Sequence, residues 1–380
     1  MSKTTIQWCD EVLNPARGCT AVSPGCLNCY AARTATRFAK PGEAFAGLAR
    51  LKDQPSDANG RKRPKLAVWS GEVTLIPKAL HEPLHWSPKH PKRVFVGSVT
   101  DMFHESIPFG YIAALFAVMA ATPWVTYQLV TKRARRMAAW FHWVDSRPTE
   151  GLVHGPPPMA HPFKPLCDGA ELYGVPVDFG RLHDLRGGGP APWPLPNVHL
   201  LTSTENQETF DERVPYLLGC PAVVHGVSAE PLLGPIDMGW ALSPTHAKAH
   251  VQALIVHPHQ MEPLPFYAHL RWVITGGESG PGARACDAAW IRDLHRQVML
   301  RPPGEAAFFP KQLGSLAYDD DHGIVGARLP LTSEAAKDVR RLKDGHGGDE
   351  TEWAHDLQGL RTFPTPGPLS PAQRRHLGMT

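Results

Sequence analysis

Short apolar segments rich in Val, Ile and Phe recur along the chain, and most are followed by a stretch with the apolar spacing of a helix. This alternation is typical of strand and helix units that build a parallel sheet with crossover helices. The predicted strands are Ile6–Trp8, Leu66–Trp69, Val94–Ser98, Thr126–Val130, Val198–Thr202, Val223–Val227, Trp272–Thr275 and Ala307–Pro310. The predicted helices are Ala31–Phe38, Tyr111–Ala121, Ala134–Trp143, Phe210–Leu218 and Ala288–Leu300. We therefore expect an α/β fold, a complete or partial parallel β/α barrel.

The barrel is expected to occupy residues 1–330 of the 380, with a C-terminal extension over residues 331–380. Residues 146–196 and 239–265 lack a clear period, so they are predicted to be long insertions. The longest apolar run, Tyr111–Ala121, is too short to span a membrane, and the N-terminus lacks the layout of a signal peptide. We expect a soluble, cytoplasmic protein without a membrane partner.

Four of the seven cysteines fall within Cys9–Cys29. Because cytoplasmic thiols stay reduced, clustered cysteines in such a chain indicate metal ligands rather than disulfides. Six residues separate Cys19 from Cys26 and two separate Cys26 from Cys29, while Pro24 and Gly25 bend the segment between them. Three thiolates can hold a [4Fe-4S] cluster and leave one iron open, so Cys19, Cys26 and Cys29 are the predicted metal ligands.

Structural zinc is the main alternative for these cysteines. Zinc requires four ligands, and Cys9 or one of the 20 histidines would supply the fourth. The spacing alone does not exclude zinc. The position of the motif, after the first predicted strand and before a helix, favours the cluster over a small zinc module.

Polar residues follow most of the predicted strands, at the edge where β/α barrels carry their active sites. Asp101, Lys132, Arg133, Glu230 and Glu278 are the predicted catalytic residues among them. A guanidinium such as that of Arg133 suits a carboxylate or a phosphate, and the two glutamates suit proton transfer. The alternatives are helix capping for Asp101, and salt bridges with Lys311 or Arg284 for the glutamates.

The loop from Gly18 to Tyr30 resembles the three-cysteine loop of the radical S-adenosylmethionine superfamily, although its first gap has six residues where three are usual. Much of the chain is also similar to a phage-associated three-cysteine-motif family of unknown function. The resembling segments are Trp8–Tyr30, Val94–His104, Leu129–Arg133, Val227–Asp237, Gly276–Arg284, Phe309–Gln312 and Gly347–Pro364. The resemblance implies a barrel of the radical S-adenosylmethionine type.

In that superfamily a glycine-rich turn ending in Glu binds the ammonium group of the cofactor, and Ser70, Gly71 and Glu72 match that place. Ser98 and Thr100 follow the next predicted strand and suit the ribose or carboxylate of the cofactor, or equally the capping of the next helix. Tyr30, beside the last cysteine, is suited to pack on the adenine, or is a core aromatic at a helix start. The predicted cofactors are the [4Fe-4S] cluster and S-adenosylmethionine.

The resemblance implies reductive cleavage of S-adenosylmethionine to a 5′-deoxyadenosyl radical, with electrons from a flavodoxin-like or ferredoxin-like partner. We expect the substrate to be a nucleic acid, DNA or RNA, or a nucleotide that the enzyme modifies or repairs. The basic run Lys132–Arg136, 11 tryptophans available for stacking and the phage association that the resemblance implies support this expectation. A second basic run, Arg50–Lys65, suits the neutralisation of phosphates or, equally, a solvated loop. The rival from another class is a zinc-stabilised nucleic-acid-binding protein without radical chemistry.

Overall fold

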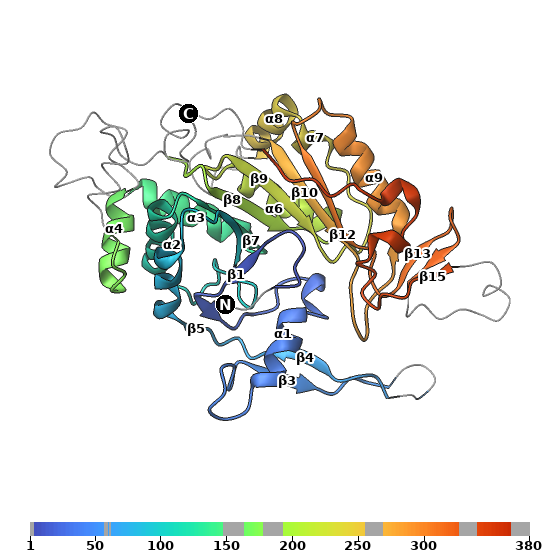
Figure 1. The fold of residues 1–380 in the computed structure, drawn as a ribbon, viewed down its shortest axis with the longest axis horizontal. Coiled ribbons are helices and arrows are strands. Elements are labelled where there is room, and N and C mark those ends of the chain that lie inside the picture. The colour runs from blue at the N-terminus through green and yellow to red at the C-terminus, as the bar shows by residue number, and fades with distance from the viewer. Residues whose placement is uncertain are drawn as a thin grey trace.

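The centre of the fold is one sheet of seven parallel strands, in the order β1-β6-β7-β8-β9-β10-β12 (Figure 1). The computed structural model describes residues 4–56, 60, 62–146, 163–177, 193–254, 269–326 and 340–365. The strands of the central sheet are β1 (Glu11–Leu13), β6 (Lys92–Val96), β7 (Val125–Thr131), β8 (Val198–Ser203), β9 (Val224–Ala229), β10 (Leu270–Gly276) and β12 (Ala307–Gln312). The predicted α/β fold with a parallel sheet is confirmed.

Helices connect and cover these strands. They are α1 (Tyr30–Ala35), α2 (Phe109–Ala121), α3 (Ala134–Asp145), α4 (Phe163–Leu172), α6 (Gln207–Leu218), α7 (Gly239–Leu242), α8 (Pro244–Leu254) and α9 (Ala288–Met299). Shorter 3₁₀ segments are η1 (Pro24–Cys26), η2 (Thr36–Phe38), η3 (Pro77–His85), η4 (Glu350–Glu352) and η5 (His355–Leu357). All five predicted helices are present, with ends that differ by a few residues.

The sheet is curled into a half-barrel. Trp8 lies with its ring centroid 4.7 Å from that of Phe95 on β6 and 6.1 Å from that of Trp272 on β10. Four strand spacings separate β6 from β10, which would be about 19 Å in a flat sheet. One indole reaches both rings because the sheet bends around it. No pairing joins β1 to β12 in the part of the chain that the structure describes, so of the two predicted forms the partial barrel is present.

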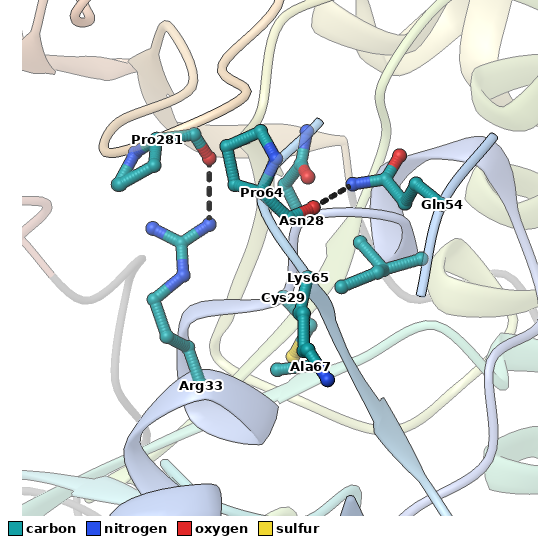
Figure 2. A pocket seen from close by; sticks show the side chains of 9 residues that line it. Asn28, Cys29, Arg33, Gln54, Pro64, Lys65, Ala67 and Pro281 are labelled. Carbon is teal, nitrogen blue, oxygen red and sulfur yellow. Dashed lines mark hydrogen bonds between the residues drawn. The ribbon is translucent and has the colours of Figure 1, made fainter. Parts of the chain in front are cut away.

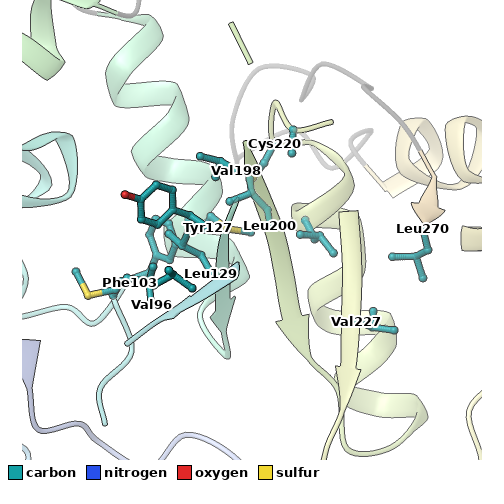
Figure 3. Packing of buried hydrophobic residues seen from close by; sticks show 14 of the residues in the cluster. Val96, Phe103, Tyr127, Leu129, Val198, Leu200, Cys220, Val227 and Leu270 are labelled. Carbon is teal, nitrogen blue, oxygen red and sulfur yellow. The ribbon is translucent and has the colours of Figure 1, made fainter. Parts of the chain in front are cut away.

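Alternating residues of the strands fill two apolar layers, one on each face of the sheet. Val96 points toward the helices, where it shares one large core with Tyr127 and Leu200 (Figure 3). Val94 belongs to the same core. Phe95, between the two valines, belongs instead to the smaller cluster on the concave face. Period-two alternation with both faces apolar is expected of a parallel sheet covered on both sides.

Two strand predictions were wrong in their placement. Ile6–Trp8 forms a turn rather than a strand, and Trp8, 3% exposed, fills the concave face instead. Leu66–Trp69 is a strand, β4, but it pairs antiparallel with β3 (Ala49–Lys52) in a hairpin outside the central sheet. Apolar content alone identified both segments. It does not distinguish a strand of the central sheet from a turn that fills the concave face or from a strand of a separate hairpin.

Two small sheets flank the central one. Strand β2 (Ala16–Arg17) pairs with β5 (Thr74–Leu75), and the other sheet has the order β11-β13-β14-β15. The strands of the latter are β11 (Cys286–Asp287), β13 (Ala317–Asp319), β14 (Ile324–Val325) and β15 (Arg340–Arg341). Strand β15 belongs to the predicted C-terminal extension, whose described part packs on the barrel through Trp353, 1% exposed.

The predicted insertions contain helices where the structure describes them. Helix α4 lies in the first insertion and packs on α2, with Gly169 against the backbone of Gly110. Helices α7 and α8 lie in the second. Residues 147–162 and 178–192 of the first insertion and 255–265 of the second lie outside the described residues. None of the described helices has the length and apolar character that a membrane crossing requires.

Candidate functional site

The three cysteines of the predicted motif lie on a loop that leaves the carboxyl end of β1. The loop continues from β2 through Cys19, Cys26 and Cys29 to the start of α1. Its first turn depends on Gly18, whose φ is +95° and whose missing Cβ would lie 2.1 Å from the carbonyl oxygen of Glu72. A side chain at this position would be strained and would clash, so glycine directly precedes the first cysteine.

The loop is bonded to the carboxyl ends of four strands of the half-barrel, which fixes it across their common edge. After β6, Thr100 Oγ1 donates to the Gly18 carbonyl (2.7 Å), and after β7, Arg133 Nη2 donates to the Thr20 carbonyl (3.1 Å). After β8, Glu205 Oε1 accepts from Ser23 Oγ (2.7 Å), and after β10, Glu278 Oε2 accepts from Asn28 Nδ2 (2.8 Å). The cysteines are therefore held over the edge where β/α proteins carry their sites.

Glu205, just after β8, is the buried centre of this attachment. Its side chain is 0% exposed and accepts hydrogen bonds from Ser23, from Lys132 Nζ and from Arg213 Nη1 at 3.2 Å. Gly25 lies against the same carboxylate, because a Cβ there would be 2.3 Å from Glu205 Oε1. A buried carboxylate with two cationic partners is retained only where the pairing is complete, so this cluster is a fixed part of the site.

Asp101 and Arg133 form a second buried pair, 3.2 Å apart, beside the first cysteine. Asp101 also accepts from the Thr131 hydroxyl (2.7 Å) and from the backbone N–H of Lys132 (3.0 Å). Arg133 donates to Glu105 (2.9 Å) and approaches Cys19 Sγ at 3.7 Å. The pair joins the ends of β6 and β7 and directs one cation at the thiol.

The charges around the thiols act on them unequally. Burial raises the pKa of Cys19 to about 12 and also raises the pKa of Cys29. Burial acts in the same direction on Cys26, but the positive charge of Lys132 and the hydrogen bonds from Val22 and Ser23 together outweigh it and lower the pKa of that thiol. Negative charge on Cys29 raises the pKa of Cys19, so the thiols share one electrostatic environment. Lys132 and Arg133 are placed to offset the charge of several thiolates.

The donor types of the loop fit an iron-sulfur cluster, since three thiolates with cations beside them suit a negatively charged sulfur-ligated centre. Within the described ranges, no group of three Cys, His, Asp or Glu side chains is already arranged to hold a metal ion. Cys9, the suggested fourth zinc ligand, packs in the concave apolar cluster with Trp8 and donates to the carbonyl of Ile6 at 3.8 Å. Its position gives no support to a four-cysteine zinc site.

The turn Ser70–Gly71–Glu72 lies beside the cysteine loop, but it follows a different strand from the one predicted. It follows β4 of the hairpin rather than the second strand of the central sheet, and that second strand is β6. The turn nevertheless lies beside the loop, with the Glu72 carbonyl against Gly18 and the Gly71 backbone near Thr20. The Glu72 side chain is exposed.

Ser98 and Thr100 follow β6 as expected, and both already have partners in the cysteine loop or just before it. Ser98 Oγ donates to Asn14 Oδ1 at 3.1 Å, and Thr100 donates to the carbonyl of Gly18. The Tyr30 hydroxyl donates to the Ser98 carbonyl at 2.7 Å, while the ring is 52% exposed. Tyr30 is therefore a fixed surface aromatic next to Cys29, not a core residue.

Both predicted catalytic glutamates are ion-paired, as the alternative reading of the sequence allowed. Glu230, after β9, lies 2.9 Å from Lys311 Nζ. Glu278, after β10, is held by two bonds from the Arg284 guanidinium, at 2.6 and 3.0 Å, and the pKa of its carboxyl is lowered although burial alone would raise it. Together with Asp101 and Lys132, these residues carry complete ion pairs at the edge of the sheet.

Sequence reasoning missed several residues that build the site. Glu205 stood at a strand end without an assigned role, whereas nothing in the sequence marked Ser23, Asn28 or Arg213. Their partners are up to 250 residues away along the chain, as for Asn28 and Glu278. Only the order of the strands in the sheet brings such residues together.

A shallow pocket opens beside Cys29, between α1 and the β3–β4 hairpin (Figure 2). Its lining includes Asn28, Arg33, Gln54 and Lys65, so it is polar and contains two cations. Arg33 Nη2 donates to the carbonyl of Pro281 at 3.1 Å, which closes the side of the pocket nearest the loop after β10.

The fold and the site define an α/β protein with a parallel half-barrel and a three-cysteine loop fixed across the carboxyl ends of its strands. The chain belongs to the DUF5131 family, described as a protein of unknown function, whose family model matches residues 3–355. Neither the curated proteins nor the solved structures contain a match to the chain.

Proposed function

We propose that the chain is an iron-sulfur enzyme that cleaves S-adenosylmethionine and uses the resulting 5′-deoxyadenosyl radical to modify or repair a nucleic acid or a nucleotide. The observation that carries the proposal is the cysteine loop, which brings three thiols to the carboxyl edge of a parallel half-barrel and faces them with Lys132 and Arg133. A disulfide role is not supported, since the cysteines are unpaired thiols.

Cys19, Cys26 and Cys29 would hold the cluster. When bound, the cluster and S-adenosylmethionine would supply one-electron cleavage of a carbon-sulfur bond and a radical able to abstract hydrogen. Lys132 and Arg133 would offset the negative charge of the thiolates, because both cations lie against the loop. A flavodoxin-like or ferredoxin-like protein would be the electron donor.

The aminoacyl and nucleoside parts of the cofactor would be bound by the residues around the loop. Tyr30 offers an exposed ring next to Cys29, and Ser98 and Thr100 keep acceptor capacity on hydroxyls that already donate. Ser70, Gly71 and Glu72 are adjacent to Gly18, so Glu72 would still bind the ammonium group if its exposed side chain turns toward the loop.

Asp101, Glu230 and Glu278 are better suited to position the site than to transfer protons. Each is ion-paired with a basic side chain, and an acid or base would have to leave that pair before it reached a substrate. For the same reason Lys132 and Arg133 are poor candidates for a substrate phosphate, since they are paired with Glu205, Asp101 and Glu105 and lie against the thiols of the loop.

The experiment is an assay of 5′-deoxyadenosine after anaerobic reconstitution with iron and sulfide, addition of S-adenosylmethionine and reduction with dithionite. Wild-type protein should release 5′-deoxyadenosine, and Cys26→Ala should release none. Cys286→Ala, which removes a buried thiol of β11, is the matched control and should retain the activity. Protein that purifies with stoichiometric zinc and releases no 5′-deoxyadenosine would favour the zinc-stabilised nucleic-acid-binding protein instead.

A further inference from the structure

The β3–β4 hairpin carries one of the two basic runs of the chain and stands apart from the sheet (Figure 1). Residues 50–65 carry six basic and two acidic residues, a net charge of +4, whereas the whole chain has a net charge of +3. Arg50, Leu51 and Lys52 are all exposed, so both faces of β3 are open to solvent. Lys62 and Arg63, in the segment that leads into β4, are exposed as well.

The base of the hairpin is fixed to the cysteine loop. Ala49 packs with Phe45 and Leu48 in a small apolar cluster against α1, and Trp69 contacts the same cluster. The Ser70 N–H donates to the Leu48 carbonyl at 2.8 Å. Leu66 and Ala67 line the same pocket as Cys29 (Figure 2). The charged arm therefore has a defined position relative to the thiols.

An exposed aromatic ring accompanies these charges. Phe38, at the end of η2, is 50% exposed, and its carbonyl accepts from the N–H of Phe45 at 3.0 Å. Arg37, next to it, is also exposed. Cations that track a backbone together with rings open for stacking are the combination that binds single-stranded nucleic acid, while a duplex keeps the faces of its bases covered.

We infer that the β3–β4 hairpin is an arm that binds single-stranded nucleic acid, DNA or RNA, and leads the strand past the cysteine loop. The inference rests on the proposed function in that it names the substrate class and the surface that holds it. It also moves the expected phosphate contacts away from Lys132 and Arg133, whose charges are paired, to the arm, whose described acidic partner is Asp53, 3.2 Å from Lys65.

The test is fluorescence anisotropy of labelled 20-nucleotide DNA and RNA, single- and double-stranded, with full-length protein over a salt series and without S-adenosylmethionine or reductant. The variant is Lys52→Ala/Lys62→Ala/Arg63→Ala. Loss of three phosphate contacts should reduce the salt slope by about two units and weaken single-strand binding by about 100-fold at 0.1 M salt. The matched control, Lys78→Ala/Lys89→Ala/Lys248→Ala, removes three exposed lysines of other elements and should bind like wild type.

A second variant pair tests the ring without changing charge. Phe38→Ala should weaken single-strand binding by about tenfold with the salt slope unchanged, and Phe38→Trp should restore it. Thermal unfolding checks that each variant is folded. Should the arm variant fail this check, the single change Lys62→Ala takes its place, with an expected slope change of about 0.7.

Several results would overturn the inference: no binding of any oligonucleotide at low salt, equal losses in the arm and control variants, or stronger binding of duplex than of single strands. If no oligonucleotide binds, but an acidic flavodoxin binds to wild type and not to the arm variant, the arm would be a protein-docking surface instead. The assay needs neither cluster nor cofactor. Failure to form 5′-deoxyadenosine with oligonucleotide binding intact would therefore contradict the proposed chemistry and leave the arm in place.

Discussion

Glu205 and Gly25 meet at a close contact between the cysteine loop and the sheet, because a Cβ at Gly25 would lie 2.3 Å from Glu205 Oε1. The carboxylate cannot withdraw, because Lys132, Arg213 and Ser23 all bond to it and it is fully buried. Sequence reasoning found the cysteines from their spacing. It had no means to find this contact, since Gly25 follows β1 and Glu205 follows β8, with two further strands of the central sheet between them along the chain.

Gly25→Ala tests the fit at this residue. The added methyl would press on Glu205, so we expect a loss of about 1 to 3 kcal/mol in the free energy of unfolding, and a displaced loop with reduced cluster content. Chemical denaturation and iron analysis measure the two effects. Gly345→Ala is the matched control, because no atom lies within 4 Å of the position of its Cβ. Equal stability of the two variants would show that the contact is loose.

At the scale of elements, the sequence predicted six of the seven central strands and all five helices, because period-two and helical spacing mark them directly. It misplaced the first strand, since β1 has only three residues and the more apolar Ile6–Trp8 beside it is a turn. It also assigned β4 to the barrel, because a hairpin strand and a sheet strand have the same local pattern. Pairing partners are not visible in local sequence.

Strands β8 and β9 each bury a histidine whose charged form is disfavoured. Burial lowers the pKa of His199 to about 4 and that of His225 to about 4. The unfolded chain binds these protons with a pKa near 6.5, so the unfolded state gains protons first as the pH falls. The stability contributed by the neutral rings is complete above pH 6.5 and is lost between pH 6.5 and 4.

We therefore expect His199→Phe to reduce the acid sensitivity of the fold. Relative to wild type, its free energy of unfolding should rise by about 2 to 3 kcal/mol between pH 7 and pH 4.5. Denaturant titrations at the two pH values give this difference. His90→Phe, which replaces an exposed histidine, is the control and should show little change. A pH-independent difference for His199→Phe would mean that the ring takes up its proton as readily in the fold as in the unfolded chain.

At the scale of the whole molecule, the described part of the C-terminal extension is joined to the half-barrel. Trp353 belongs to the main core, and its indole N–H donates to the Gly347 carbonyl at 3.0 Å. The N–H of Thr362 donates to the carbonyl of Phe308 on β12 at 2.8 Å. The sequence predicted a boundary near residue 330 because polar, proline-containing sequence follows it, yet the extension stabilises the edge of the sheet.

Trp353→Ala tests whether the C-terminal extension and the half-barrel unfold together. The substitution should lower the free energy of unfolding of the entire molecule by about 3 to 5 kcal/mol, with one cooperative transition retained. Calorimetry and far-ultraviolet circular dichroism follow the transition. Leu300→Ala, at a side chain that is 71% exposed, should change stability by less than about 0.5 kcal/mol. An unchanged main transition in Trp353→Ala would mean that the extension unfolds independently.

The iron and acid-labile sulfide content of protein prepared without oxygen tests the central claim most directly. The cysteine loop should hold about four iron and four sulfide per chain. Cys19→Ala, Cys26→Ala and Cys29→Ala should each lose the cluster while remaining folded by thermal unfolding. Cys9→Ala and Cys286→Ala, at buried thiols outside the loop, should retain it. One equivalent of zinc without sulfide, or a full cluster in Cys26→Ala, would contradict the account.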